Sequence, residues 1–297
     1  MYVGGLFDKA VCRLSDPMVL DLCAAPGGKT TQILSRLGGR GHLVANEVIG
    51  SRVAILAENV AKWGCPNVTV TNSDASVLAG AYRGRRQFDV VVVDAPCSGE
   101  GMFRKGDEAV NNWSPDNVNL CARRQRRILS DIWPALRDGG FMIYSTCTFN
   151  RLEDEDNVDW IAQKLGAEVL EQRHFYPGID KGEGFFAALL VKKAPVGGPA
   201  SRNPKKSVEL RVFRSEFPQA DEALSIGLDR SKYTVVELGR EDALKFLAKE
   251  PLVFPDSPLG LILLTYKSLA LGFVKNLGRR SNNLHPMPRR IRNLHQS

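Results

Sequence analysis

Two cysteines stand in polar sequence rich in glycine, serine and threonine, where a cysteine of the ordinary buried kind is not expected. Cys97 lies in Asp94-Ala-Pro-Cys-Ser-Gly-Glu-Gly101, and Cys147 lies in Ser145-Thr-Cys-Thr148. Each stretch follows an apolar run typical of a buried strand. A thiol becomes a nucleophile when it is partly exposed in an electropositive setting. The pair therefore indicates thiol chemistry, with a buried, inert cysteine as the alternative for either residue alone.

A third motif, Asp21-Leu-Cys-Ala-Ala-Pro-Gly-Gly-Lys-Thr30, indicates a ligand at the start of a helix. Its small residues and two glycines let the backbone approach a bound group closely. The dinucleotide pattern Gly-x-Gly-x-x-Gly is absent, and Cys23 stands where a phosphate-binding loop needs glycine. A nucleotide hydrolase is therefore disfavoured, although the valine run ending at Asp94 mimics one. A tight turn without a ligand is the other alternative.

Two acidic residues follow neighbouring apolar runs at the positions where strands are expected to end. Glu47 comes 19 residues after Gly28, where a carboxylate can accept hydrogen bonds from ribose hydroxyls. Asp74 follows the next run and could meet an adenine edge. Each acid alone is explained as well by capping of the next helix. Together they favour a cofactor that contains adenosine.

Short apolar runs alternate with helical patterns from Met18 to residue 191, which predicts an α/β fold with a doubly wound, mostly parallel sheet. The carboxyl ends of such strands converge on one crevice, so Cys97 and Cys147 are expected to flank one pocket. The connection from Asp94 to Asp116 is long enough to be functional. The expected strands are 18–22, 42–45, 68–71, 88–93, 141–145, 168–170 and 185–191, and the expected helices are 29–37, 52–62, 117–136 and 153–165.

The last third of the chain differs in composition and charge. Residues 194–206 are rich in proline, glycine, serine and basic residues and read as a linker between residues 17–193 and a smaller α+β domain at 207–297. Residues 1–16 form a short N-terminal segment. Residues 1–194 contain 23 Lys/Arg and 23 Asp/Glu, whereas residues 195–297 contain 17 and 10. This surplus indicates a polyanionic partner, or merely a basic surface. The second domain is expected to hold strands 208–213, 234–238 and 260–266 and a helix over 241–249.

The composition excludes several classes of protein. A chain of 297 residues with 43% hydrophobic and 25% charged residues is neither collagen-like, coiled-coil nor largely disordered. The absence of a long apolar run and of a secretory signal predicts a cytoplasmic protein without a membrane span. The six cysteines form no Cys-x-x-Cys pair and the four histidines are scattered, so neither a metal site nor a disulfide framework is expected.

The motifs at 21–30, 94–101 and 145–148 together resemble the RNA cytosine carbon-5 methyltransferases of the Nol–Nop–Sun family. The continuation Met102-Phe-Arg-Lys105, with Trp113, resembles the bacterial ribosomal-RNA (16S) branch. The segment from Leu271 to Arg290 is similar to the small PUA-like RNA-binding domain of some of these enzymes. The resemblance covers residues 17–193 closely and residues 207–297 more loosely.

This resemblance implies a Rossmann-like methyltransferase that transfers a methyl group from S-adenosylmethionine to carbon-5 of a cytosine in RNA, with 16S ribosomal RNA as the expected substrate. Cys147 would be the nucleophile that adds to carbon-6, Cys97 would assist release of the adduct, and Asp94 would position the base. The target base must be single-stranded or flipped. The expected cofactor-binding residues are Cys23, Ala24, Ala25, Pro26, Gly27, Gly28, Lys29, Glu47, Asp74 and Asp94.

One other function and one departure from the family stand beside this interpretation. A non-catalytic RNA-binding module that keeps the fold is the alternative, but the intact cysteines, Asp94 and glycines argue against it. In the family, a substantial RNA-binding segment usually precedes the first motif, and residues 1–16 do not resemble it. This departure bears on RNA affinity.

Overall fold

The computed structural model describes residues 2–82, 86–194, 210, 212 and 229–292. The chain divides into two compact units, each built on one sheet. Apart from Ala194, the expected linker lies outside the described residues, as does most of the expected strand 208–213. Of that strand, Val212 forms an isolated antiparallel bridge with Thr71.

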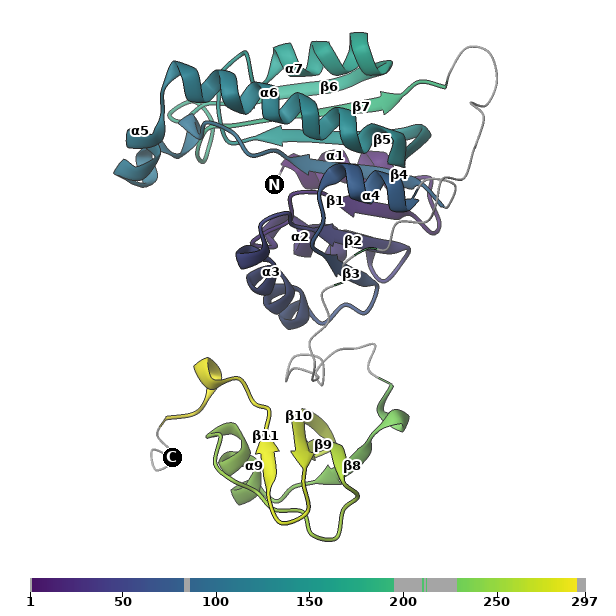
Figure 1. Ribbon diagram of the computed structural model, residues 1–297, viewed down its shortest axis with the longest axis vertical. Helices are drawn as coiled ribbons and strands as arrows, with labels where there is room; N and C mark the ends of the chain where they lie inside the picture. The colour runs from purple at the N-terminus through teal and green to yellow at the C-terminus, as the bar shows by residue number, and fades with distance from the viewer. Residues whose placement is uncertain (1, 83–85, 195–209, 211, 213–228, 293–297) are drawn as a thin grey trace. The chain divides into compact units, whose positions relative to one another are not determined.

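The first unit holds the sheet that the alternating pattern predicts, and the expected fold class is confirmed. Its strand order is β3-β2-β1-β4-β5-β7-β6, and β7 runs in the opposite direction to the other six strands of this sheet (Figure 1). The order reverses between β1 and β4, which is where open α/β sheets bind ligands. The strands are β1 (Met18–Asp21), β2 (His42–Asn46), β3 (Val68–Thr71), β4 (Phe88–Asp94), β5 (Leu136–Thr146), β6 (Ala167–Phe175) and β7 (Phe185–Lys192).

Helices cover both faces of this sheet (Figure 1). On one face, α6 packs against α4 and against α7. On the other face, α1 packs against α2 and against strands β5 and β7. The helices are α1 (Tyr2–Val11), α2 (Gly28–Leu37), α3 (Gly50–Trp63), α4 (Ala75–Tyr82), α5 (Asp107–Asn112), α6 (Pro115–Ile132) and α7 (Glu155–Trp160), with 3₁₀ turns η1 (Glu100–Lys105) and η2 (Trp133–Ala135) and a π-helical turn η3 (Ile161–Leu165).

The core forms because successive side chains of a strand point to opposite faces. Val91 and Val93 of β4 share a buried cluster with Leu129 and Ile132 of α6. Val90 and Val92 are also fully buried, as expected for a central strand covered on both faces. The valine run thus places Asp94 rigidly at the carboxyl edge of the sheet.

Several local expectations were wrong or incomplete, among them the absence of α4 and α5 and the short strand 168–170, which is β6 in the structure. The helix expected over 117–136 ends at Ile132, because Pro134 lacks the N–H that a continuing helix needs. The presumed stop Asp138-Gly139-Gly140 instead lies inside β5, beside a register shift against β4. The helix within residues 1–16 was not predicted either. There, α1 buries Val3, Leu6, Phe7, Ala10 and Val11, which have the spacing of one helical face.

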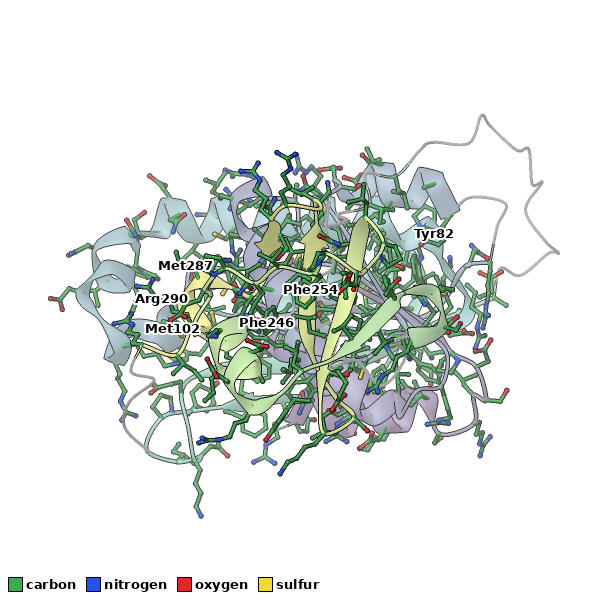
Figure 2. All side chains as sticks on the ribbon, turned by 90° about the horizontal axis from the view of Figure 1, so that it is seen from below. Tyr82, Met102, Phe246, Phe254, Met287 and Arg290 are labelled. Atoms are coloured by element: carbon green, nitrogen blue, oxygen red, sulfur yellow. The ribbon has the colours of Figure 1, made fainter. Side chains whose placement is uncertain are left out.

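The second unit is a small α+β structure with strand order β11-β10-β9-β8. Phe246 from its helix is fully buried, and Phe254 packs against the same cluster (both labelled in Figure 2). Strands β10 and β11 were not predicted. The elements are η4 (Arg230–Lys232), β8 (Thr234–Glu237), α9 (Arg240–Leu247), β9 (Gly260–Tyr266), β10 (Leu269–Asn276), β11 (Ser281–Asn283) and η5 (Met287–Arg289).

Among the described residues, no helix is both long and apolar enough to cross a membrane. The histidine, cysteine and acidic side chains of the same residues form no group of three or more that could hold a metal ion.

Candidate active site

The structure brings the two motif cysteines together. Cys97 lies just beyond β4 and Cys147 just beyond β5, because these neighbouring parallel strands end at the same edge of the sheet. Their sulfur atoms are 3.2 Å apart, and both side chains are partly buried. At this distance one thiol donates a hydrogen bond to the other. Residues 50 apart in sequence thus form one chemical unit.

The two thiols differ in their readiness to ionise. The hydrogen bond from Cys97 lowers the pKa of Cys147, and the Lys29 ammonium acts in the same direction, while burial and Asp94 oppose it. The same hydrogen bond, together with burial, raises the pKa of Cys97. The geometry therefore favours a Cys147 thiolate that accepts a hydrogen bond from a neutral Cys97 thiol. A thiolate is the reactive form of cysteine.

Asp94 connects three elements at this edge. Its Oδ2 pairs with the Lys29 ammonium of α2 at 2.8 Å, and its Oδ1 accepts a hydrogen bond from Ser145 Oγ of β5 at 2.7 Å. Both Asp94 and Lys29 remain partly exposed. The carboxylate thus has fixed partners and retains access to solvent beside the thiols.

The segment from Cys23 to Lys29 joins β1 to the start of α2, as the motif predicts. Gly27 adopts φ 113°, a left-handed conformation that favours glycine. A side chain at Gly28 would meet nothing within 4 Å, so open space lies beside the first turn of the helix. Ala24 N–H donates to Asn46 O at 2.8 Å, and Arg52 donates to Ala25 O at 2.6 Å, which fixes the turn.

Asp21 sits below this turn as a fully buried carboxyl. Its Oδ2 accepts a hydrogen bond from Thr30 Oγ1 at 2.7 Å, whereas its Oδ1 has no hydrogen-bond partner among the described residues. Burial raises the pKa of Asp21 to about 7, and burial also raises that of Cys23. An unpaired buried acceptor beside a helix N-terminus with open space is a fitting place for a polar ligand.

The two strand-end acids are placed where expected, and each also makes the contact of a helix cap. Glu47 Oε1 accepts from Ile49 N–H at 2.9 Å at the start of α3, and Glu47 Oε2 lies 3.4 Å from Arg52. Asp74 Oδ1 accepts from Ser76 N–H at 3.0 Å, and this contact together with the Ser76 hydroxyl lowers its pKa. The capping alternative is thus realised for both acids. Their roles toward a cofactor stay predictions.

Glu100, which the sequence analysis left without a role, organises the loop after β4. Its carboxylate accepts hydrogen bonds from Trp113 Nε1 at 2.9 Å and from Thr148 Oγ1 at 2.8 Å. Next to it, Gly101 N–H donates to Cys147 O at 2.9 Å. A Cβ on Gly101 would lie 2.2 Å from Gly184 O, so only glycine permits this approach. The loop is therefore attached directly to the backbone of Cys147.

Two further buried polar residues were missed. Gln125 lies on the buried face of α6, where a polar residue in an apolar stripe is the available signal. Glu153 begins the acidic run Glu153-Asp-Glu-Asp156, which on sequence alone resembles an exposed helix start, so it carried no signal.

Asp154 predicts how stability depends on pH. Its carboxyl is buried, Thr146 Oγ1 donates to it at 2.5 Å, and burial raises its pKa to about 8. An acid whose pKa is higher in the folded than in the unfolded protein stabilises the fold at low pH, and this contribution is lost as pH rises through the folded value. We therefore expect the melting temperature to fall between about pH 4, near the pKa of an unfolded aspartate, and about pH 8, and Asp154→Asn to reduce this fall.

Calorimetry across this range measures the effect. Asp21, with its raised pKa of about 7, contributes to the fall in wild type and variant alike. Asp156→Asn is the matched control, because Asp156 pairs with the exposed Arg151. An Asp154→Asn protein that loses as much stability as wild type across the same range would contradict the assignment.

A mostly parallel sheet with a glycine-rich turn at its switch point, strand-end acids and a close thiol pair is the arrangement that the resemblance of the sequence to methyltransferases implies. Residues 13–191 match the family "16S rRNA methyltransferase RsmB/F". Residues 233–291 match the "Methyltransferase RsmF PUA domain". The chain belongs to the RsmB/F family of S-adenosylmethionine-dependent RNA methyltransferases, which confirms the resemblance noted in the sequence.

Curated relatives and solved structures agree with this assignment. "Ribosomal RNA small subunit methyltransferase F" of Escherichia coli O157:H7 is 38% identical over 208 residues, which covers 64% of this chain and 43% of the relative. The protein of the same name from Klebsiella pneumoniae is 40% identical over 196 residues, covering 60% and 41%. The chain thus spans less than half the length of these relatives. NSun6 from Pyrococcus horikoshii, solved with SFG, aligns with TM-score 0.57 and 29% identity over 65% of this chain and 52% of that chain.

Proposed function

We propose that this protein methylates carbon-5 of a cytosine in small-subunit ribosomal RNA, with S-adenosylmethionine as methyl donor. The observation that carries the proposal is the thiol pair, with Cys97 Sγ and Cys147 Sγ 3.2 Å apart beside the Lys29–Asp94 ion pair. The relatives named as ribosomal RNA small subunit methyltransferase F support the choice of RNA. Because that RNA is cytoplasmic in bacteria, the proposal includes a cytoplasmic location.

Cys147 supplies the nucleophile in this proposal. Carbon-5 of cytosine is a poor nucleophile until a group adds to carbon-6, and a thiolate performs this addition. The lowered pKa of Cys147 provides the thiolate. Asp94, held by Lys29 and Ser145, accepts a hydrogen bond from the exocyclic amino group of the cytosine and so positions the base for addition. Carbon-5 then carries the electron density needed to take the methyl group.

Cys97 completes the reaction after methyl transfer. The proton on carbon-5 must leave, its bonding electrons form the carbon-5 to carbon-6 double bond, and the bond from carbon-6 to sulfur breaks to return Cys147 as a thiolate. Once Cys147 is bound to carbon-6, it no longer accepts a hydrogen bond as a thiolate, and the main cause of the raised Cys97 pKa is removed. Cys97, which is partly exposed, can then lose its own proton to solvent and accept the one from carbon-5. The hydrogen bond between the two thiols therefore sets the order in which they act: Cys147 reacts first, and Cys97 ionises only after Cys147 is bound to carbon-6.

The residues at the β1–α2 turn fit the proposed cofactor. When bound, S-adenosylmethionine supplies an electrophilic methyl group on its sulfonium. The open space at Gly28 and the first turn of α2 suit its polar end, and the unpaired Asp21 Oδ1 offers an acceptor nearby. Glu47 is assigned to the ribose hydroxyls and Asp74 to the adenine edge. The remaining contacts are assigned to Cys23, Ala24, Ala25, Pro26, Gly27, Lys29 and Asp94.

Substituting Glu47 is expected to weaken cofactor binding. Glu47→Ala should reduce affinity for S-adenosylmethionine by about 1–3 kcal/mol, since hydrogen bonds to a charged acceptor are removed. Calorimetric titration measures this, and Glu47→Gln is the companion variant because its amide oxygen can still cap Ile49. Unchanged binding in both variants would leave Glu47 as a helix cap only. Tight magnesium-dependent binding of ATP would instead favour the nucleotide hydrolase.

The second unit is proposed to bind RNA without regard to sequence. Arg279, Arg280, Arg290 and Arg292 are exposed, and no acid follows Asp256. For every phosphate that the protein no longer neutralises, the slope of log affinity against log salt should become shallower by about 0.7–0.9. We expect Arg279→Gln/Arg280→Gln to reduce both RNA affinity and this slope in filter-binding titrations from low to moderate salt. A slope equal to that of wild type would show that these arginines contact no phosphate.

The division into residues 1–16, 17–193, 194–206 and 207–297 stays part of this proposal. The experiment that tests the function is transfer of labelled methyl groups to naked small-subunit ribosomal RNA, to 30S particles and to bulk transfer RNA. The products are then digested to nucleosides and separated. The proposal predicts 5-methylcytidine from ribosomal RNA. RNA binding without methylation of any of the three would favour the non-catalytic module.

A further inference from the structure

Glu153 is a fully buried carboxylate that contacts the loop carrying Cys97. It lies where the chain turns from β5 toward α7, yet its side chain reaches back 55 residues to Ser98. Ser98 N–H donates to Glu153 Oε2 at 3.0 Å and to Oε1 at 3.3 Å. Ser98 directly follows Cys97, so this bond fixes the peptide group on one side of the thiol.

Gln125 fixes the peptide group on the other side. Its Nε2 donates both to Pro96 O at 3.0 Å and to Glu153 Oε2 at 2.7 Å. Its Oε1 accepts from Asn157 Nδ2 at 2.7 Å, which sets the orientation of the amide. Because Pro96 precedes Cys97 and Ser98 follows it, the Glu153–Gln125 pair holds the backbone on both sides of this residue. Among the described residues, the hydrogen bonds of these two side chains go to oxygen and nitrogen atoms and not to sulfur.

The charge of Glu153 acts on Cys97 as well. No lysine or arginine among the described residues forms an ion pair with Glu153, so its carboxylate is held by hydrogen bonds. A nearby negative charge disfavours a second one, and Glu153 therefore opposes early ionisation of Cys97. Glu153 thus influences both the position of Cys97 and the ionisation of its thiol.

We propose that Glu153 is a positioning residue for release of the RNA adduct, acting through Cys97 by fixing the two peptide groups that flank it. This inference rests on the proposed function. It assigns Glu153 to the later half of the reaction, in which the carbon-5 proton leaves and the bond from carbon-6 to Cys147 breaks. Addition of Cys147 and methyl transfer do not depend on it.

The test is the partition between a trapped and a released product. In Glu153→Gln, the negative charge is removed, and an amide NH₂ replaces one of the two oxygens that face Ser98 N–H, so the bonds from Ser98 and Gln125 are made to a neutral group and are weaker. We expect turnover to fall about 10–100-fold because bonds to a charged group are weakened, while formation of the adduct in a single turnover stays within about threefold of wild type. A protein–RNA species that survives denaturing gels and requires S-adenosylmethionine should therefore accumulate.

Two further variants serve as a control for specificity and as a second way to disturb the same contacts. Glu155→Gln is the matched control, because Glu155 contacts His174 and no part of the Cys97 loop, and its partition should equal that of wild type. Gln125→Met removes the bonds to Pro96 and Glu153 while leaving the Ser98–Glu153 bond, and it should shift the partition in the same direction. It decides the matter if Glu153→Gln does not fold.

Opposite outcomes separate this inference from the proposed function. If Glu153→Gln and Gln125→Met slow adduct formation and turnover equally, with no trapped species, both residues have a merely structural role and the inference is overturned. If wild type itself neither methylates cytosine nor forms a covalent species, the proposed function fails first. Accumulation in Glu155→Gln as well would show that the effect is not specific to the Cys97 loop and would also overturn the inference.

Discussion

Cys147→Ala is expected to lower methyl transfer to RNA at least about 1,000-fold, or about 4 kcal/mol at about 1.36 kcal/mol per tenfold change in rate. Without the sulfur, nothing adds to carbon-6, and carbon-5 stays too poor a nucleophile to take a methyl group. Covalent attachment to RNA should disappear with turnover. Labelled methyl transfer and denaturing gels of the protein–RNA mixture measure the two effects together.

Cys121→Ala is the control for this substitution. Cys121 is buried on α6 and belongs to neither thiol motif, so its removal should leave both readouts near those of wild type. Retention of full turnover by Cys147→Ala would contradict thiol addition by this residue.

Cys97→Ala is expected to trap the reaction after methyl transfer. The alanine variant still contains Cys147, so the adduct forms and the methyl group is transferred, but no thiol remains to assist removal of the carbon-5 proton. Blocking a late step populates the intermediate before it. A protein–RNA species that resists denaturation should accumulate in the presence of S-adenosylmethionine, while multiple turnover falls by about two to four orders of magnitude.

The hydrogen bond between the thiols adds a second expectation for this variant. Because Cys97 lowers the pKa of Cys147, its removal should also slow the addition step at neutral pH. The trapped species should then form more slowly than in wild type but persist. If Cys97→Ala forms no covalent species and Cys147→Ala accumulates it, the two assignments are reversed.

The sequence predicted those parts of the fold that local patterns determine. The strand–helix alternation led to the parallel sheet, and the valine run of β4 marked its centre, because burial on both faces demands unbroken apolar residues. The end of α6 and the start of β5 were placed wrongly, since Gly139-Gly140 resembles a helix stop although Pro134 acts earlier. Pro134 and Gly139-Gly140 are both able to end a helix. The pairing of β5 with β4 decides which of them does so, and that pairing is not visible in the sequence alone.

The candidate site divides in the same way. The proximity of Cys97 and Cys147 could be predicted from the sequence, because neighbouring parallel strands end at a common edge of the sheet. Glu153 could not, since its contact with Ser98 depends on how the chain after β5 folds back over the loop after β4. Glu47 shows a third case. The position of Glu47 follows from the end of β2, so it could be predicted. Its carboxylate also caps Ile49 N–H, and the same carboxylate is proposed to bind the cofactor, so the sequence alone does not separate the two roles.

The central claim, that Cys147 forms the bond to the RNA base, is tested most directly by peptide mapping of a trapped complex. RNA that carries 5-fluorocytidine at the target position has fluorine in place of the proton that must leave carbon-5, so the adduct cannot be resolved after methyl transfer. Wild-type protein is incubated with this RNA and S-adenosylmethionine, digested, and analysed by mass spectrometry. The account predicts a nucleotide, methylated at carbon-5, attached to the peptide that contains Cys147. Attachment to the Cys97 peptide, or no covalent species from protein that methylates unmodified RNA, would contradict it.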